Sequence, residues 1–188
     1  MYSNHDLHIR PIKENDLPRL WELIYKDNAP EWKKWDAPYF PHQAMTYESF
    51  RTKADNWIDT EEIWLITVQD QICGTISYYF EDIQKNWLEM GIILHESQNW
   101  SKGLGTRALR LWMTHIFNTL PVVRVGLTTW SGNKRMIRVS EKLGMQMEGR
   151  IRKVRYYEGN YYDSIRMGIL REEWVHLVAA ATKTEIQQ

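Results

Sequence analysis

The chain has 188 residues, of which 43% are apolar and 13% aromatic, enough for a sizeable folded core. Its 24 Lys and Arg balance 24 Asp and Glu, which argues against a protein that binds nucleic acid through bulk charge. A single cysteine, Cys73, excludes an intrachain disulfide and a cysteine-rich zinc site. We see no apolar signal segment and no membrane span, so we expect one cytoplasmic domain over residues 1–188, with no membrane partner.

The first half of the chain predicts a strand, two amphipathic helices and an antiparallel meander, because apolar residues recur first at helical and then at strand spacing. In chain order the predicted elements are a strand at 7–10, a helix at 16–25, an irregular aromatic segment at 30–42, a helix at 47–58, and strands at 63–68, 72–80 and 87–94.

The second half predicts a crossover followed by a hairpin. The elements are a polar loop at 97–105, a helix to about 118, a strand at 122–130, a helix from 133 to Gly144, strands at 145–157 and 161–170, and a partly helical tail. A strand, a long helix and another strand make a parallel crossover. The fold class is therefore α/β (α+β), with a mixed sheet that is parallel in its middle and antiparallel outside.

The most informative segment is residues 100–106, WSKGLGT, which lies between a predicted strand and a predicted helix. Gly103 and Gly105 allow close backbone approach to a ligand and can align several N–H groups at the positive end of the helix. From residue 97 to 140 there is no Asp or Glu, but there are seven basic residues, Lys102, Arg107, Arg110, Arg124, Lys134, Arg135 and Arg138. The pattern predicts a site for phosphate or pyrophosphate, since local field rather than net charge attracts a small polyanion.

Three alternative roles for the two glycines compete with this prediction. The glycines could simply shape a tight turn between strand and helix. A P-loop requires Gly, four residues and Gly-Lys-Ser/Thr, which the sequence lacks. A dinucleotide fingerprint is closer, because Gly103, Gly105 and Ala108 match it, but the acidic residue expected about 20 positions later is missing.

Three stretches together resemble the GNAT family of N-acetyltransferases. They are "LHIRPIKENDLPRLWEL", "WLEMGIILHESQNWSKGLGTRALRLWM" and "NKRMIRVSEKLGMQMEGRIRKVRYYEGNYYDSIRMGILREEW". The loop is similar to the family's acetyl-CoA motif, Arg/Gln-x-x-Gly-x-Gly/Ala, except that Trp100 occupies the first position. The third stretch is similar to the branch that acetylates ribosomal-protein N-termini, spermidine and other amines.

The resemblance implies a sheet whose central parallel strands, residues 87–94 and 122–130, splay apart and hold acetyl-CoA as co-substrate. Pantetheine would bond to the strand edge, pyrophosphate would lie on the loop, and Asn133 would contact the pantetheine arm. The implied cofactor residues are Ile92, Ile93, Leu94, Trp100, Ser101, Lys102, Gly103, Leu104, Gly105, Thr106 and Asn133.

The resemblance also guides the choice of catalytic residues. Glu89 lies where many members have a general base, and its strand places it on the same face as Trp87. Ser140 stands where the family often has a Tyr that acts as general acid. Because Ser is a much weaker acid, the general acid could also be water or Tyr156. No covalent intermediate is needed, and no metal site is expected: His5 and His8 have no partner ligands.

We therefore expect an N-acetyltransferase that acts on a primary amine by direct attack in a ternary complex. The alternatives are a non-catalytic acyl-CoA-binding or sensing module on the same fold, and a dinucleotide enzyme. The aromatic, acidic segment 31–42 is either a substrate lid or simply packed over the core. Either a small-molecule or a peptide amine fits as acceptor. Hairpins of this branch often help form dimers, so the tyrosines near 156–162 predict a homodimer.

Overall fold

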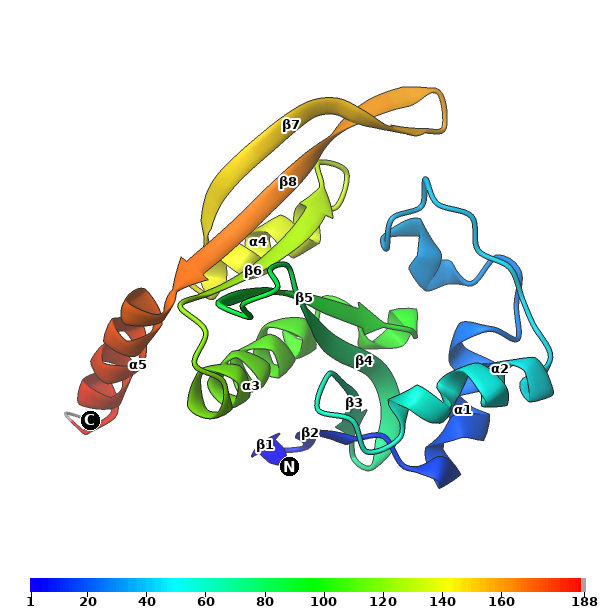
Figure 1. Ribbon diagram of the computed structural model, residues 1–188, viewed down its shortest axis with the longest axis horizontal. Coiled ribbons are helices and arrows are strands. Elements are labelled where there is room, and N and C mark those ends of the chain that lie inside the picture. Colours follow the sequence, from blue (N-terminus) through cyan, green and yellow to red (C-terminus); the bar gives the residue numbers. More distant parts are fainter. Residues whose placement is uncertain (187–188) are drawn as a thin grey trace.

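The computed structural model describes residues 1–186 as one mixed sheet flanked by helices (Figure 1). The strands are β1 (Tyr2–Asn4), β2 (Leu7–Pro11), β3 (Ile63–Val68), β4 (Gln71–Phe80), β5 (Trp87–Leu94), β6 (Arg124–Trp130), β7 (Gln146–Tyr157) and β8 (Asn160–Leu170). The α-helices are α1 (Leu17–Ile24), α2 (Tyr47–Ala54), α3 (Leu104–Thr119), α4 (Lys134–Lys142) and α5 (Arg171–Ile186).

The sheet runs in the order β1-β2-β3-β4-β5-β6-β8-β7 and is antiparallel except between β5 and β6. The meander β3–β4–β5 and the parallel crossover β5–α3–β6 confirm the predicted order. Strand β1 was not predicted; it is a short, polar partner of β2, and such a sequence carries little strand signal.

The two central parallel strands separate soon after they meet. They pair only from Trp87 opposite Arg124 to Glu89 opposite Gly126. Strand β5 then continues to Leu94 alongside β4, and β6 continues to Trp130 alongside β8. The predicted splay at the centre of the sheet is therefore confirmed, and it opens a gap between two strands that are each still held on their other side.

Successive residues of a strand point to opposite faces of the sheet, and each face carries its own apolar core. On β3, Trp64 and Ile66 belong to the core beneath α3, whereas Leu65 belongs to the core beneath α1 and α2. Helix α3 buries one stripe, which includes Leu109 and Trp112, both fully inaccessible to solvent. The opposing layers fix the direction in which each strand residue points and so decide which side chains face the gap.

Helix ends follow local signals. Asn133 caps α4 by accepting a hydrogen bond from the Met136 amide at 3.1 Å. Gly144, just beyond the helix, has φ 85°, the left-handed conformation expected of a glycine that ends a helix. The second predicted helix stops earlier than its apolar spacing suggested, because the chain tightens into a 3-10 turn over Asp55–Trp57.

The β7–β8 hairpin projects beyond the helices (Figure 1). Strand β7 is largely exposed along its length and forms the edge of the sheet. Tyr156 and Tyr161 pair across the hairpin with ring centroids 5.0 Å apart, and both are exposed.

Candidate active site

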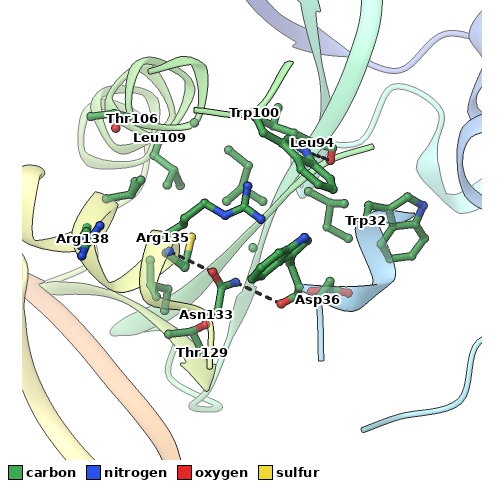
Figure 2. Close-up of a pocket in the computed structure, with 18 of the residues that line it drawn as sticks. Trp32, Asp36, Leu94, Trp100, Thr106, Leu109, Thr129, Asn133, Arg135 and Arg138 are labelled. Atoms are coloured by element: carbon green, nitrogen blue, oxygen red, sulfur yellow. Dashed lines mark hydrogen bonds between the residues drawn. The ribbon is translucent and has the colours of Figure 1, made fainter. Parts of the chain in front are cut away.

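A cavity of about 370 Å³ lies where β5 and β6 diverge. Its walls come from the free stretch of β5, the end of β6, the start of α3, one side of α4 and the segment from Trp32 to Tyr39 (Figure 2). All but one of the residues that the resemblance assigned to the cofactor line it, namely Ile92, Ile93, Leu94, Trp100, Ser101, Gly103, Leu104, Gly105, Thr106 and Asn133. The exception is Lys102, which is exposed and does not line the cavity.

The glycine loop presents an open helix N-terminus to this cavity. Gly103 has φ 77° and is the N-cap of α3, so the amides of the first turn have no partner within the helix. No atom lies within 4 Å of the position that a Cβ would take at Gly103 or Gly105. No acidic residue stands in this first turn. The loop therefore combines free N–H groups, a positive helix end and open space, which suits a phosphate group.

The basic residues divide into two sets. Arg135, Arg138 and Lys142, all on α4, line the cavity. Arg107 instead donates to Asp6 at 2.7 Å, and Arg124 binds the carboxylates of Glu89 and Glu148. The basic residues that line the cavity thus all come from α4, and Lys142 was missed because it lies just outside the acid-free stretch.

Trp100, which replaces the usual Arg or Gln of the motif, ties the loop to the sheet. Its indole N–H donates to the Leu94 carbonyl oxygen at 2.8 Å. The guanidinium of Arg135 lies 4.9 Å from the Trp100 ring centroid and 3.9 Å from that of Trp35, and Figure 2 shows Arg135 reaching across the pocket toward Trp100. This cation–aromatic stack joins α4, the loop and the aromatic segment.

Asn133 links the aromatic segment to the cavity. Its amide donates to the carbonyl oxygen of Trp35 at 3.1 Å, and the Trp130 indole donates to the same oxygen at 3.0 Å. Two donors on one carbonyl hold the segment against the end of β6 (Figure 2). The segment therefore lines the cavity, and its Trp32 is also buried in the core with residues of α1 and α2.

Glu89 lies at the vertex where the central strands part and is fully buried. Its Oε1 accepts a hydrogen bond from Arg124 at 3.3 Å, and its Oε2 accepts one from the Thr128 hydroxyl at 2.8 Å. The Arg166 guanidinium lies 4.0 Å from the Glu89 Oε1 atom. Glu89 does not itself line this cavity, whereas Thr128 does and is a solvent-exposed residue. Thr128 is therefore the contact between this carboxylate and the cavity, and sequence reasoning missed it.

Gly126 makes room for this arrangement. A Cβ on Gly126 would lie 2.5 Å from the Glu89 Oε1 atom and 2.5 Å from the Arg124 guanidinium. Any side chain at residue 126 would push the ion pair apart. The absence of a side chain at Gly126 thus leaves room for the ion pair beside the parallel strands.

Ser140 is fully buried and does not line the cavity. Its hydroxyl donates to the carbonyl oxygen of Met136, one turn earlier, at 2.9 Å. Tyr156, the other acid considered, is exposed on the hairpin and is also absent from the cavity wall. The structure thus brings Glu89 to the edge of the cavity through Thr128, but it brings neither hydroxyl into it.

Cys73 is buried, and burial raises the pKa of its thiol to about 12, so it is not a nucleophile. Within residues 1–186, no three His, Cys, Asp or Glu side chains gather closely enough to hold a metal ion. Nor does any helix in that part of the chain have the length and apolar character that crossing a membrane requires.

Comparison with known proteins places these features in context. The model of the acetyltransferase (GNAT) domain matches residues 6–146. The N-acetyltransferase YokL, derived from prophage SPbeta of Bacillus subtilis, is 28% identical over 176 residues, which cover 92% of this chain and 94% of YokL. The spermidine N(1)-acetyltransferase of Escherichia coli K12 is 25% identical over 175 residues, covering 93% of this chain and 91% of the enzyme.

A solved structure shows the same fold. The spermidine N-acetyltransferase of Vibrio cholerae, crystallised with CoA and spermine, superposes with a TM-score of 0.75 at 18% identity. The match covers 92% of this chain and 99% of that one. The family match spans most of the chain, including the strand–loop–helix unit with its open helix N-terminus, so this protein belongs to the GNAT acetyltransferase family.

Proposed function

We propose that this protein transfers the acetyl group of acetyl-CoA to a primary amine by direct attack within a ternary complex. Membership of the family makes the chain an N-acetyltransferase with acetyl-CoA as co-substrate. The observation that carries the proposal is the open N-terminus of α3 placed directly beside the diverging strands β5 and β6.

The lining of the cavity supports binding of the co-substrate. We assign the diphosphate to the amides of Gly103, Leu104 and Gly105, with Arg138 and Lys142 adding positive charge from α4. The pantetheine arm takes the gap beside Ile92 and Ile93, where β5 pairs with β4 but no longer with β6. Unpaired strand amides and carbonyls suit an amide-containing arm, because buried backbone groups require partners.

When bound, acetyl-CoA supplies a thioester, whose carbonyl carbon an amine can attack without a covalent enzyme intermediate. The protein must then remove the excess proton that the nitrogen carries after its attack. We assign this task to Glu89 acting through Thr128: the Thr128 oxygen accepts the proton while its own hydroxyl proton passes to Glu89 Oε2. The 2.8 Å hydrogen bond between them already has the required direction.

Ser140 remains our candidate for a hydrogen bond to the leaving sulfur. This role requires its hydroxyl to rotate away from the Met136 carbonyl oxygen. The Ser140→Ala variant tests the role. We expect kcat to fall severalfold, which corresponds to the contribution of about one neutral hydrogen bond, while KM for acetyl-CoA stays unchanged. Unchanged kcat would leave Ser140 with only its bond inside α4.

A non-catalytic acyl-CoA-binding module is the second candidate. The observation that favours it is the ion pairing of Glu89, whose carboxylate is already bonded to Arg124 and Thr128. Turnover separates the two candidates: the enzyme releases CoA when given acetyl-CoA and an amine from a panel of polyamines, peptides with varied N-termini and aminoglycosides. Binding of acetyl-CoA without CoA release from any amine would favour the binding module.

The Glu89→Gln variant tests the mechanism, with Glu148→Gln as its matched control, because both carboxylates bind Arg124. We expect Glu89→Gln to lower kcat by about a hundredfold, the lower range for general acid–base catalysis. The affinity of this variant for CoA, measured by calorimetry, should equal that of the wild type. Glu148→Gln should keep kcat within a few fold, and equal losses in both variants would point to the ion pair rather than to proton transfer.

The acceptor class and the assembly are also proposals. The spermidine acetyltransferase relative supports a small polyamine as acceptor. The exposed hairpin carries Met147, Ile151, Val154 and Tyr156, an apolar surface that a homodimer would cover. Light scattering during gel filtration measures the mass directly, and a monomer of 22.6 kDa would contradict the dimer.

A further inference from the structure

Asp36 is an acidic residue in the wall of the cavity. It lines the cavity from the aromatic segment and is half-buried. Across residues 1–186, no donor forms a hydrogen bond or ion pair with its carboxylate at the distances seen elsewhere in the structure. The neighbouring Lys33 ammonium instead donates to the carbonyl oxygens of Asp36 and Ala37, at 2.8 Å and 3.1 Å. A partly desolvated carboxylate of this kind is stabilised by a cation.

The backbone beside Asp36 is fixed in place. The preceding carbonyl, that of Trp35, accepts hydrogen bonds from Trp130 and Asn133. The Arg135 guanidinium stacks on the Trp35 ring, 3.9 Å from the ring centroid. These contacts come from β6 and α4, the same elements that line the cavity. The carboxylate is therefore held in the wall rather than carried on a free loop.

Two aromatic rings share the cavity wall with Asp36. Tyr39 and Trp130 line the same cavity, with ring centroids 6.2 Å apart at an interplanar angle of 84°. Ring faces and a carboxylate together attract an ammonium group. Figure 2 places Asp36 on the opposite side of the pocket from Thr106 and Leu109 of α3, so this end is remote from the proposed diphosphate site.

We propose that Asp36, which shares the cavity wall with Tyr39 and Trp130, binds the ammonium group of the acceptor and takes its first proton. This inference rests on the proposed function and names the residue that meets the acceptor. The N–H bond breaks, the proton moves to a carboxylate oxygen of Asp36, and the nitrogen keeps the electron pair that attacks the thioester carbon. The C–S bond then breaks, and its electron pair leaves with the sulfur of CoA as thiolate.

The nitrogen must lose a second proton to become an amide, and the Thr128–Glu89 pair receives it. The two carboxylates thus have separate tasks. Asp36 converts the ammonium group to a nucleophilic amine, and Glu89 receives the proton that the nitrogen loses after its attack. Each carboxylate later returns its proton, one to the CoA thiolate and one to water. The overall change is one ammonium and one thioester to one amide, one thiol and one proton.

The environment of Asp36 suits a base at neutral pH. Burial raises the pKa of Asp36, and the positive charge of Lys33 offsets part of this rise. Burial also raises the pKa of Tyr39; Asp36 adds to that rise and Arg155 opposes it. Lys33, Tyr39 and Arg155 are therefore the titratable groups that set the protonation of this corner, with Arg155 acting from β7. A base with a raised pKa captures a proton better than an ordinary aspartate.

The test compares Asp36→Asn with Glu31→Gln, which removes a negative charge from an exposed residue of the same segment outside the cavity. Spermidine is titrated calorimetrically into protein saturated with CoA, which measures acceptor binding without turnover. We expect at least tenfold weaker binding for Asp36→Asn, unchanged affinity for CoA, and no change for Glu31→Gln. Asp36→Glu should restore part of the binding.

The pH dependence of kcat/KM is the second readout. In the wild type, activity should fall on acidification at a pH above the range of an ordinary aspartate, because protonated Asp36 neither binds nor deprotonates the amine. That acidic limb should disappear in Asp36→Asn, leaving a lower, flatter profile. Spermidine binding and a profile equal to wild type in Asp36→Asn would overturn the inference.

Failure of the proposed function gives a different result. A wild type that binds CoA but acetylates no amine of the panel would overturn both the function and this inference. A wild type that acetylates spermidine, together with an unaffected Asp36→Asn variant, would overturn only the role of Asp36 and leave the acetyltransferase proposal intact.

Discussion

Replacing Gly105 by alanine separates the stability of α3 from its proposed role in binding. Gly105 is in the first turn of the helix, its φ is not positive, and no atom lies within 4 Å of the position of a new Cβ. Alanine is the better helix former by up to about 1 kcal/mol. We therefore expect the free energy of unfolding to rise by at most that amount, which raises Tm by about 2–4 °C in a protein of this size.

The same methyl group would enter the space that we assign to the diphosphate. A hydrogen bond between an amide and a charged phosphate contributes about 1.5–3 kcal/mol. Losing one of them weakens CoA binding by about tenfold to a hundredfold, because 1.4 kcal/mol corresponds to a factor of about ten. The variant should therefore melt higher and bind CoA more weakly, as measured by thermal unfolding and calorimetry.

Gly159→Ala is the matched control. Gly159, at the tip of the β7–β8 hairpin, also has no atom within 4 Å of its Cβ position, but its φ is 77°. An alanine there costs about 1–2 kcal/mol of left-handed strain and should lower Tm while CoA affinity stays unchanged. A Gly105→Ala protein that binds CoA as tightly as the wild type would refute the placement of the diphosphate on this loop.

Two further predictions concern buried groups. Burial lowers the pKa of His95 to about 3, below the value of about 6.5 in the unfolded chain. Because the unfolded chain then binds a proton that the folded protein does not, stability should fall by about 1.4 kcal/mol per pH unit from pH 6 toward pH 4. Urea unfolding at several pH values should show that the free energy of unfolding falls less steeply with acidification in His95→Gln than in the wild type. Equal slopes in the two proteins would argue against a lowered pKa of His95. Cys73, with its raised pKa and burial, should resist iodoacetamide at pH 8 in the folded protein and react once urea unfolds the chain; rapid modification of the native protein would contradict its burial.

The sequence alone determined the elements whose signal is local. The strands predicted at 63–68 and 87–94 match the bounds of β3 and β5, because β-rich runs between polar turns carry their own signal. The Gly103–Gly105 loop and the Asn133 cap depend on backbone conformation within a few residues, and both were predicted. The open N-terminus of α3 therefore followed from local chemistry.

Only the tertiary structure decided which charged groups are free to act. Arg107 and Asp6 are 101 residues apart in the sequence, and Arg124 and Glu89 are 35 apart, yet each pair forms a hydrogen bond. These contacts remove two cations from the field expected around the loop. Asp36 shows the reverse: the aromatic, acidic segment 31–42 was a candidate substrate lid, but its sequence did not indicate which carboxylate would line the cavity. Such outcomes depend on how distant segments pack together, which spacing along one chain does not record.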